Sequence, residues 1–149
     1  MTITGSAPLI AIPTFIYIII TAIISSSLKP FFRITENHYD LLVILAILLI
    51  LTGILGVISA ARKILKSFKK KELITDGLFR VCRNPMYASY VFFVIPGICL
   101  LFNSWLVLTT IIVNITLTLI FVPKEYKYLE ETFGEQYKRY TEKVWIKFI

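Results

Sequence analysis

The chain has 149 residues, of which 57% are hydrophobic and 17% are charged. A soluble domain is usually about 45–50% apolar and about 25% charged, so this chain departs from that class in both directions. The 16 basic and 9 acidic residues all fall within three blocks, 29–40, 62–83 and 124–149. The length allows one domain, and an aqueous core does not account for the composition. We therefore predict a single integral membrane domain over residues 1–149.

Three segments contain no charged side chain, namely 1–28, 41–61 and 84–123. A bilayer core is about 30 Å thick, and a helix of about 20 apolar residues crosses it. The first two segments are each long enough for one span. The third has 40 residues, enough for two spans joined at the polar pair 103–104, which has an aromatic residue on each side. The sequence therefore predicts an all-α membrane protein with four transmembrane helices.

The basic residues predict the orientation of these helices. The 62–83 loop has eight basic and two acidic residues, a net charge of +6, whereas the 29–40 loop is neutral. The positive-inside rule then predicts that 62–83 and both termini are cytoplasmic, with an amphipathic connector near 62–72 and a C-terminal cytosolic helical segment. Because the charge is explained by topology, nucleic-acid binding is disfavoured. No basic residue precedes the first apolar run, which favours a retained helix over a cleaved signal peptide.

Small residues predict how the second span packs. Thr52, Gly56 and Ala60 recur every fourth residue and so lie on one face of a helix. Small side chains on a shared face let membrane helices approach each other closely. We interpret this stripe as structural.

The predicted spans contain no ionisable acid or base of the kind that proton-coupled transport needs. His38 is the only histidine and lies in the 29–40 loop, so no histidine-based metal site is expected. Chemistry is therefore expected at the cytoplasmic face, within 62–87 and 123–149.

The first cluster of interest is 73–87, directly before the third predicted span. Residues 75–77 are typical of a turn, and Asn84 followed by Pro85 is typical of a helix N-cap and first helical position. Arg83 is also the kind of residue that anchors a span at the membrane interface. From these residues alone, structural and functional interpretations are equally supported.

The second cluster, 123–140, contains two aromatic stripes at helical spacing, with Gly134 between them as a candidate helix end. A pair of amphipathic helices on the membrane surface is one interpretation. It does not explain why two such clusters flank the same hydrophobic hairpin. The stripes are Tyr126, Leu129 and Phe133, then Tyr137, Tyr140 and Val144.

Together the clusters read Gly77-x-Phe79-x-x-x-Arg83-Asn84-Pro85-x-Tyr87 and then Glu125-x-x-x-Leu129-x-x-x-Phe133-Gly134-x-x-Tyr137-x-x-Tyr140. This pattern resembles the isoprenylcysteine carboxyl methyltransferase family, and the related phospholipid N-methyltransferases share much of it. The resemblance covers a core of about 73–147, half of the chain.

The resemblance implies an S-adenosylmethionine-dependent methyltransferase built from membrane helices. In that family the cofactor lies at the cytosolic membrane boundary under the C-terminal segment, and a lipophilic small molecule enters from the bilayer. The expected partners are that acceptor and membrane lipids, without nucleic acid or metal. The topology derived from charge independently puts both clusters on the cytosolic side.

The resemblance also implies residue roles. Glu125 would bind the cofactor's ammonium group, and Arg83 could bind its carboxylate through two parallel hydrogen bonds. Aromatic faces suit a sulfonium, as they do quaternary ammonium groups. The implied cofactor-binding residues are Thr75, Gly77, Phe79, Arg83, Asn84, Tyr87, Glu125, Leu129 and Tyr137, and the implied catalytic residues are Arg83, Tyr87 and Arg139. Tyr137 and Arg139 would belong to the lid or the acceptor side.

Two positions depart from the family pattern, one bearing on the acceptor and one on the number of acidic residues in the site. Asn84 stands where members that act on prenylated proteins commonly have histidine, and the usual Glu-Glu pair is Glu125-Tyr126. A carboxylate is already a nucleophile, whereas an ammonium group must first lose a proton, for which no motif histidine is present. We therefore favour a prenylcysteine-like or other lipidic carboxylate, with a phospholipid amine as the alternative.

Two further classes remain open. Sterol reductases are similar in fold and have a similar Arg-x-Pro-x-x-Tyr-like stretch, but they are much longer and bind a nicotinamide cofactor. A non-catalytic small membrane protein would use both clusters only as helix caps and surface helices. Ligand-dependent stabilisation separates these classes, because a ligand that binds only the folded state raises its stability.

Overall fold

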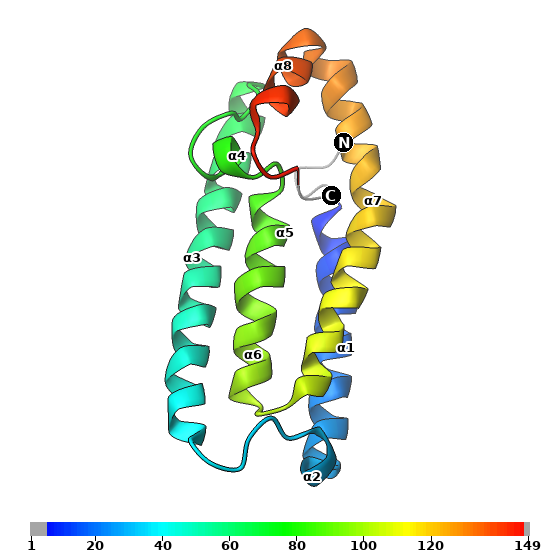
Figure 1. The fold of residues 1–149 in the computed structure, drawn as a ribbon. Coiled ribbons are helices and arrows are strands. Elements are labelled where there is room, and N and C mark those ends of the chain that lie inside the picture. The colour runs from blue at the N-terminus through cyan, green and yellow to red at the C-terminus, as the bar shows by residue number, and fades with distance from the viewer. Residues whose placement is uncertain (1–5, 148–149) are drawn as a thin grey trace.

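The computed structural model describes residues 6–147, and every regular element in that range is a helix (Figure 1). Three rods of the bundle are single helices, α1 (Ala7–Ser27), α3 (Tyr39–Lys70) and α7 (Thr110–Phe133). A fourth rod joins α5 (Pro85–Ser89), the π-helical turn η1 (Tyr90–Val94) and α6 (Ile95–Leu101). The short helices of this range are α2 (Lys29–Phe32), α4 (Leu78–Val81), η2 (Trp105–Thr109) and α8 (Glu135–Lys143).

Within the described residues, three helices are long and apolar enough to cross a membrane: Ala7–Ser27, Tyr39–Ser67 and Trp105–Phe133. The helix Pro85–Leu101 is apolar but shorter. At 1.5 Å per residue it is about 25 Å long, less than the bilayer core of about 30 Å. The prediction of four full-length spans is therefore corrected to three, with a shorter apolar helix in place of the predicted third span.

Local chemistry sets the length of this shorter rod. Pro85 begins it at the first helical position, where a missing N–H costs nothing. Asn103 has a left-handed backbone (φ 50°), and the next N–H, of Ser104, donates to the Cys99 carbonyl at 3.0 Å. These residues end the rod at the predicted turn. The wide π-helical turn directly before Pro96 accommodates a ring that an α-helix would exclude.

The predicted cytosolic helical segments are mostly continuations of the rods. α3 runs without a break to Lys70, so the predicted connector at 62–72 is the end of that helix. No glycine or proline interrupts 62–70, which explains the continuity. α7 likewise passes through Pro123, and only α8 is a separate C-terminal helix. Gly134, with φ 49°, ends α7 as predicted.

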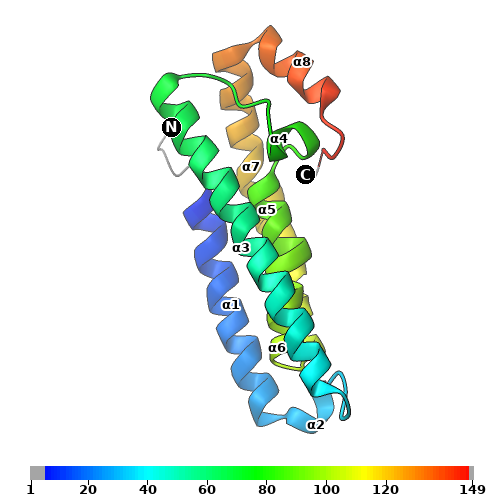
Figure 2. The ribbon, with the colours of Figure 1, turned by 90° about the vertical axis from the view of Figure 1, so that its left-hand side faces the viewer.

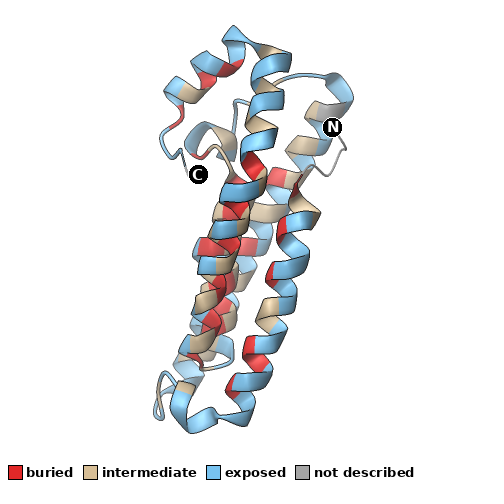
Figure 3. Cartoon of the chain, turned by 90° about the vertical axis from the view of Figure 1, so that its right-hand side faces the viewer, coloured by how far each residue is buried: buried red, intermediate tan, exposed pale blue. Residues whose placement is uncertain are grey.

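The rods pack in two pairs, with α1 against α7 and α3 along α5, η1 and α6 (Figures 1 and 2). α2 and the link from α6 to η2 lie at one end of the bundle. α4, α8 and the C-terminal segment lie at the other end, so both sequence clusters meet there, as predicted. Buried residues follow the inner faces of the rods, and the exposed outer faces are rich in large apolar side chains, as a lipid environment requires (Figure 3).

Small residues bring α3 close to the fourth rod. Gly56 and Ala60 lie on this face as predicted, and Ala60 is only 1% exposed. Thr52 is exposed, so its place in the predicted stripe is wrong. Gly53 and Ala46 occupy the face instead. The contact residues Ala46, Gly53, Gly56 and Ala60 are separated by seven, three and four residues. These steps follow the 3.6-residue helix repeat better than a strict period of four does.

Replacing Gly97 with alanine tests this contact. The added methyl group would lie 3.0 Å from the Ala46 carbonyl oxygen and 3.2 Å from the Ile50 nitrogen, and backbone atoms cannot rotate away. We expect the free energy of unfolding in detergent to fall by about 1–3 kcal/mol. In Gly56→Ala the added methyl group would clash with the Ser89 hydroxyl, so Ser89→Ala should recover part of that loss. An unchanged Tm for Gly97→Ala would contradict the packing.

Candidate active site

A cavity of about 470 Å³ lies where α3, the segment before α5, α7 and α8 meet, and we call it the inner cavity. Its volume is within the range of small-molecule sites, roughly 300–1,000 Å³. Seven aromatic side chains line it: Phe79, Tyr87, Tyr126, Tyr128, Phe133, Tyr137 and Tyr140. The charged and amide side chains of the lining are Lys71, Glu72, Arg83, Asn84 and Glu125. The combination is an aromatic chamber with a few convergent polar groups.

Arg83 is the central cation of this chamber. Its guanidinium carbon lies 3.8 Å from the centroid of the Tyr126 ring, a cation–π contact. Its Nε is buried and has no hydrogen-bond partner among the described residues. A buried donor without a partner costs free energy, and a carboxylate ligand is the acceptor that satisfies a guanidinium best.

A second unsatisfied group lines the same cavity. The Tyr137 hydroxyl is buried and has no hydrogen-bond partner within the described part of the chain. Burial raises the pKa of Tyr137 to about 12, so the hydroxyl stays protonated at physiological pH. Arg83 and Tyr137 therefore offer two donors to one ligand.

Asn84 precedes α5, but its side chain does not cap that helix. The side-chain amide instead donates to the Tyr126 hydroxyl on α7. Tyr126 stands where the family pattern has a second acidic residue. Here its ring makes the cation–π contact with Arg83, and its hydroxyl accepts the hydrogen bond from the Asn84 amide. The structure thus favours a site role for Asn84 over the capping role.

Glu125 supplies an anion on the α7 side of the chamber. Its carboxylate accepts a hydrogen bond from the backbone N–H of Ser6, the residue before α1. The Ser6 hydroxyl also donates to the Phe121 carbonyl at 3.2 Å. These bonds connect the start of α1 to the cavity wall, which no sequence signal indicated.

Backbone pairing places Arg83 under the C-terminal segment. The Ile146 N–H donates to the Val81 carbonyl at 2.8 Å, and the Arg83 N–H donates to the Ile146 carbonyl at 3.0 Å. The Tyr140 hydroxyl adds a bond to the Phe79 carbonyl at 2.8 Å. This pairing buries Cys82, which is 7% exposed, and burial raises the pKa of its thiol. Sequence reasoning missed Ile146 because it acts only through its backbone.

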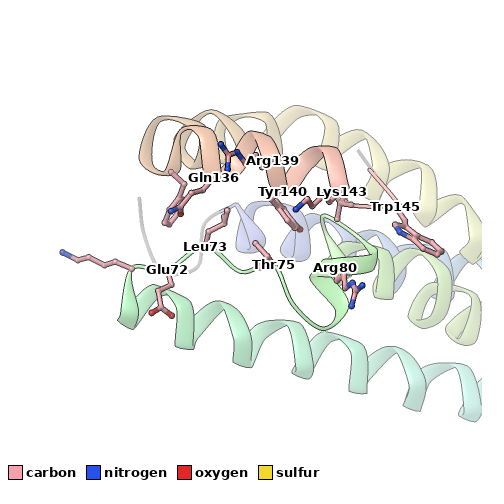
Figure 4. Close-up of a pocket in the computed structure, with 12 residues that line it drawn as sticks. Glu72, Leu73, Thr75, Arg80, Gln136, Arg139, Tyr140, Lys143 and Trp145 are labelled. Atoms are coloured by element: carbon pink, nitrogen blue, oxygen red, sulfur yellow. The ribbon is translucent and has the colours of Figure 1, made fainter.

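A larger cavity of about 890 Å³, which we call the outer cavity, lies between the 71–81 segment and α8 (Figure 4). It shares five lining residues with the inner cavity, and these lie between the two spaces: Lys71, Glu72, Leu73, Phe133 and Tyr140. The residues that line only the outer cavity are Thr75, Arg80, Gln136, Arg139, Lys143, Val144 and Trp145.

The structure brings most of the sequence-predicted site residues together. The inner cavity is lined by Phe79, Arg83, Asn84, Tyr87, Glu125, Leu129 and Tyr137. Thr75 and Arg139 line the outer cavity instead. Gly77 lines neither; it lies in the predicted turn with φ 61°, beside Lys63, whose ammonium group lies 2.5 Å from the Asp76 carboxylate. That contact holds the pKa of Asp76 below its usual value and connects the turn to α3.

An aromatic chamber at one end of an apolar helix bundle defines a membrane protein with a small-molecule site. A sequence model of the phospholipid methyltransferase family matches residues 41–136, more than half of the chain. The chain therefore belongs to the phospholipid methyltransferase family, which makes it a membrane methyltransferase. The match includes Arg83 and Glu125. The comparisons with curated proteins and with solved structures gave no match.

The family match and the three apolar helices together identify a multi-pass membrane protein. The match supports the broad methyltransferase resemblance of the sequence. The narrower assignment to the isoprenylcysteine carboxyl methyltransferases stays a hypothesis.

Ile146→Pro tests whether the C-terminal segment positions Arg83. Proline has no N–H to donate to the Val81 carbonyl, so the segment should loosen and expose Cys82. In a Cys99→Ala background, we expect N-ethylmaleimide to label Cys82 faster at unchanged expression. Lys147→Pro is the matched control, because no bond from its N–H to 78–83 is among the described contacts. Equal labelling rates in both variants would contradict this role.

Proposed function

We propose that this chain transfers the methyl group of S-adenosylmethionine to the amino group of a phospholipid at the membrane boundary. The observation that carries the proposal is that Arg83 and Glu125 line one aromatic cavity, in which the Arg83 Nε and the Tyr137 hydroxyl are unsatisfied donors. A ligand with a carboxylate, an ammonium group and a sulfonium has a complementary group for each of these features.

The residues fit the cofactor as follows. The Arg83 Nε and the Tyr137 hydroxyl would bind the carboxylate, and Glu125 would bind the ammonium group. Tyr87 and Phe79 would offer their aromatic faces to the sulfonium. When bound, the cofactor supplies an activated methyl group. The chain's own contribution is to hold the two reactants in line and to exclude water, which are the main requirements of such a displacement.

The amine is favoured as acceptor for two reasons. The family match is to phospholipid methyltransferases, and the aromatic faces of the chamber suit the N-methylated ammonium group that the transfer produces. The amine must react as its free base, so before the new C–N bond forms it must give up its proton, for which water at the membrane boundary is the acceptor.

A lipid carboxylate is the second candidate, and it includes the prenylcysteine-like acid that the sequence favoured. One observation supports it. No histidine is among the residues that line the inner cavity in the described chain, and a carboxylate needs no base.

We further infer that the site faces the cytoplasm. The inference rests on the net charge of +6 over 62–83, which lies at the same end of the bundle as the cavity.

Binding of S-adenosylhomocysteine tests the cofactor assignment. The ligand should raise the Tm of the purified protein, because it binds only the folded state. Arg83→Ala and Glu125→Ala should each weaken this binding about a hundredfold, since each removes one partner of a desolvated charged contact. Arg80→Ala and Glu130→Ala are matched controls whose side chains do not line the inner cavity.

The other outcomes separate the remaining classes. A Tm shift with NADPH instead would favour a reductase, and a shift with neither ligand would favour a non-catalytic protein. If Arg83→Ala binds the cofactor normally and fails in turnover, Arg83 belongs to the acceptor side.

Labelled methyl transfer identifies the acceptor. Membranes that contain the protein are incubated with methyl-labelled S-adenosylmethionine, and the lipid extract is then treated with mild alkali. We expect the label to stay with the lipid as an N-methyl group. Release of the label as methanol would indicate a methyl ester. The acceptor would then be the lipid carboxylate and not the amine. Glu125→Ala membranes give the background in both cases.

A further inference from the structure

The outer cavity is strongly basic. Its charged lining residues are Lys71, Arg80, Arg139 and Lys143 against a single acid, Glu72, a net charge of +3. Glu72 already lies 4.0 Å from Lys70, and none of the four cations has an ion pair in the part of the chain that the structure describes. Like charges around one cavity repel each other, so the arrangement favours an anionic occupant.

The donors are arranged on two sides of this cavity. Arg139 and Lys143 come from α8, whereas Thr75 and Arg80 come from the facing 71–81 segment (Figure 4). Gln136 adds an amide from α8. Guanidinium groups present parallel donors that match the oxygens of a phosphate, and an ammonium group supplies a further charge. Phosphate is therefore the anion that fits this set of donors.

The rim indicates that this phosphate belongs to a lipid. Trp145 lines the cavity and is 87% exposed. The pairing of the C-terminal segment places exposed Ile146 beside exposed Val81. Tryptophan is enriched where a protein meets the headgroup region, and apolar neighbours suit acyl chains. A site for free phosphate would gain nothing from this exposed apolar surface.

We propose that the outer cavity binds the phosphate group of an anionic membrane phospholipid, at a place separate from the inner cavity. The two cavities differ in the charges that line them, so they suit different ligands. Arg83 and Glu125 offer opposite charges to a ligand in the inner cavity, whereas the outer cavity offers an excess of cations. The assignment does not rest on methyl transfer. It gives the protein a preference for membranes that carry anionic lipid.

Quenching of Trp145 by brominated lipid tests the proposal. The chain has two tryptophans, and Trp105→Phe leaves Trp145 as the single fluorophore. The full chain is placed in nanodiscs of phosphatidylcholine with a fifth of phosphatidylglycerol, and the bromine is carried either by the phosphatidylglycerol or by an equal amount of phosphatidylcholine. We expect phosphatidylglycerol to be enriched about fivefold or more beside Trp145. Equal quenching by the two lipids would overturn the proposal.

A matched pair of variants assigns the effect to the cavity. Arg80→Gln, Arg139→Gln and Lys143→Gln together should abolish the preference for phosphatidylglycerol. Lys124→Gln, Lys127→Gln and Lys138→Gln together remove the same charge from residues that line neither cavity, and they should preserve the preference. Loss of the preference in both triple variants would mean general surface attraction and would contradict the proposal.

Two further measurements make the result decisive. Excess glycerol phosphate should leave the quenching by brominated phosphatidylglycerol unchanged, and displacement by it would mean a site for a soluble phosphate. The Tm of the cavity variant should match that of its Trp105→Phe parent, which verifies its fold. The quenching assay needs no cofactor, so a failure of the proposed methyl transfer and a failure of the lipid site are distinguishable. If the triple variant does not fold, Lys143→Gln alone should reduce the preference.

Discussion

The structure depends on a guanidinium held in an aromatic chamber at the end of an apolar bundle. Removing a cation from water is costly unless partners replace the lost hydration. Arg83 has the face of Tyr126, but its Nε has no acceptor among the described residues. Its backbone is fixed by Ile146, and Tyr126 is fixed by Asn84. So many contacts around an incompletely satisfied cation are what a binding site for an anionic group requires.

The bundle places this chamber at the point where its apolar rods end. The fourth rod begins at Pro85, directly after Arg83, and ends early because the backbone turns at Asn103. Close approach at Gly56 and Ala60 holds α3 against that rod, and α3 and α7 both extend past its start. The inner cavity lies between these two extensions, and α8 contributes Tyr137 and Tyr140 to its lining.

Hydropathy and turn chemistry predicted the helical class, the turn at 103–104 and the end of α7, because these depend on local composition. Contacts that depend on three-dimensional register were less predictable. Thr52 is four residues before Gly56, as the predicted stripe requires, yet it is exposed. Residues three apart on a helix are also neighbours, and it is Gly53, three before Gly56, that lies on the buried face. In the site, the motif pointed to Arg83 and Glu125. It gave no sign of Ser6 or Ile146, which act through backbone groups that any residue type carries.

Thr75 and Arg139 line the outer cavity and not the inner one, for a physical reason that also explains the two cavities. Both lie close in sequence to residues of the inner cavity, but Leu73, Phe133 and Tyr140 lie between the two spaces. These three residues, with Lys71 and Glu72, lie between a space whose charges nearly balance and one with a net charge of +3. The C-terminal segment contacts both, because Ile146 fixes the backbone of Arg83 while Trp145 lines the outer cavity. Lys71 is the one cation that lines both cavities, whereas Arg83 lines only the inner one and Arg80, Arg139 and Lys143 line only the outer one. Each cavity therefore has arginine donors of its own, and two charged ligands of different kinds need not compete for them.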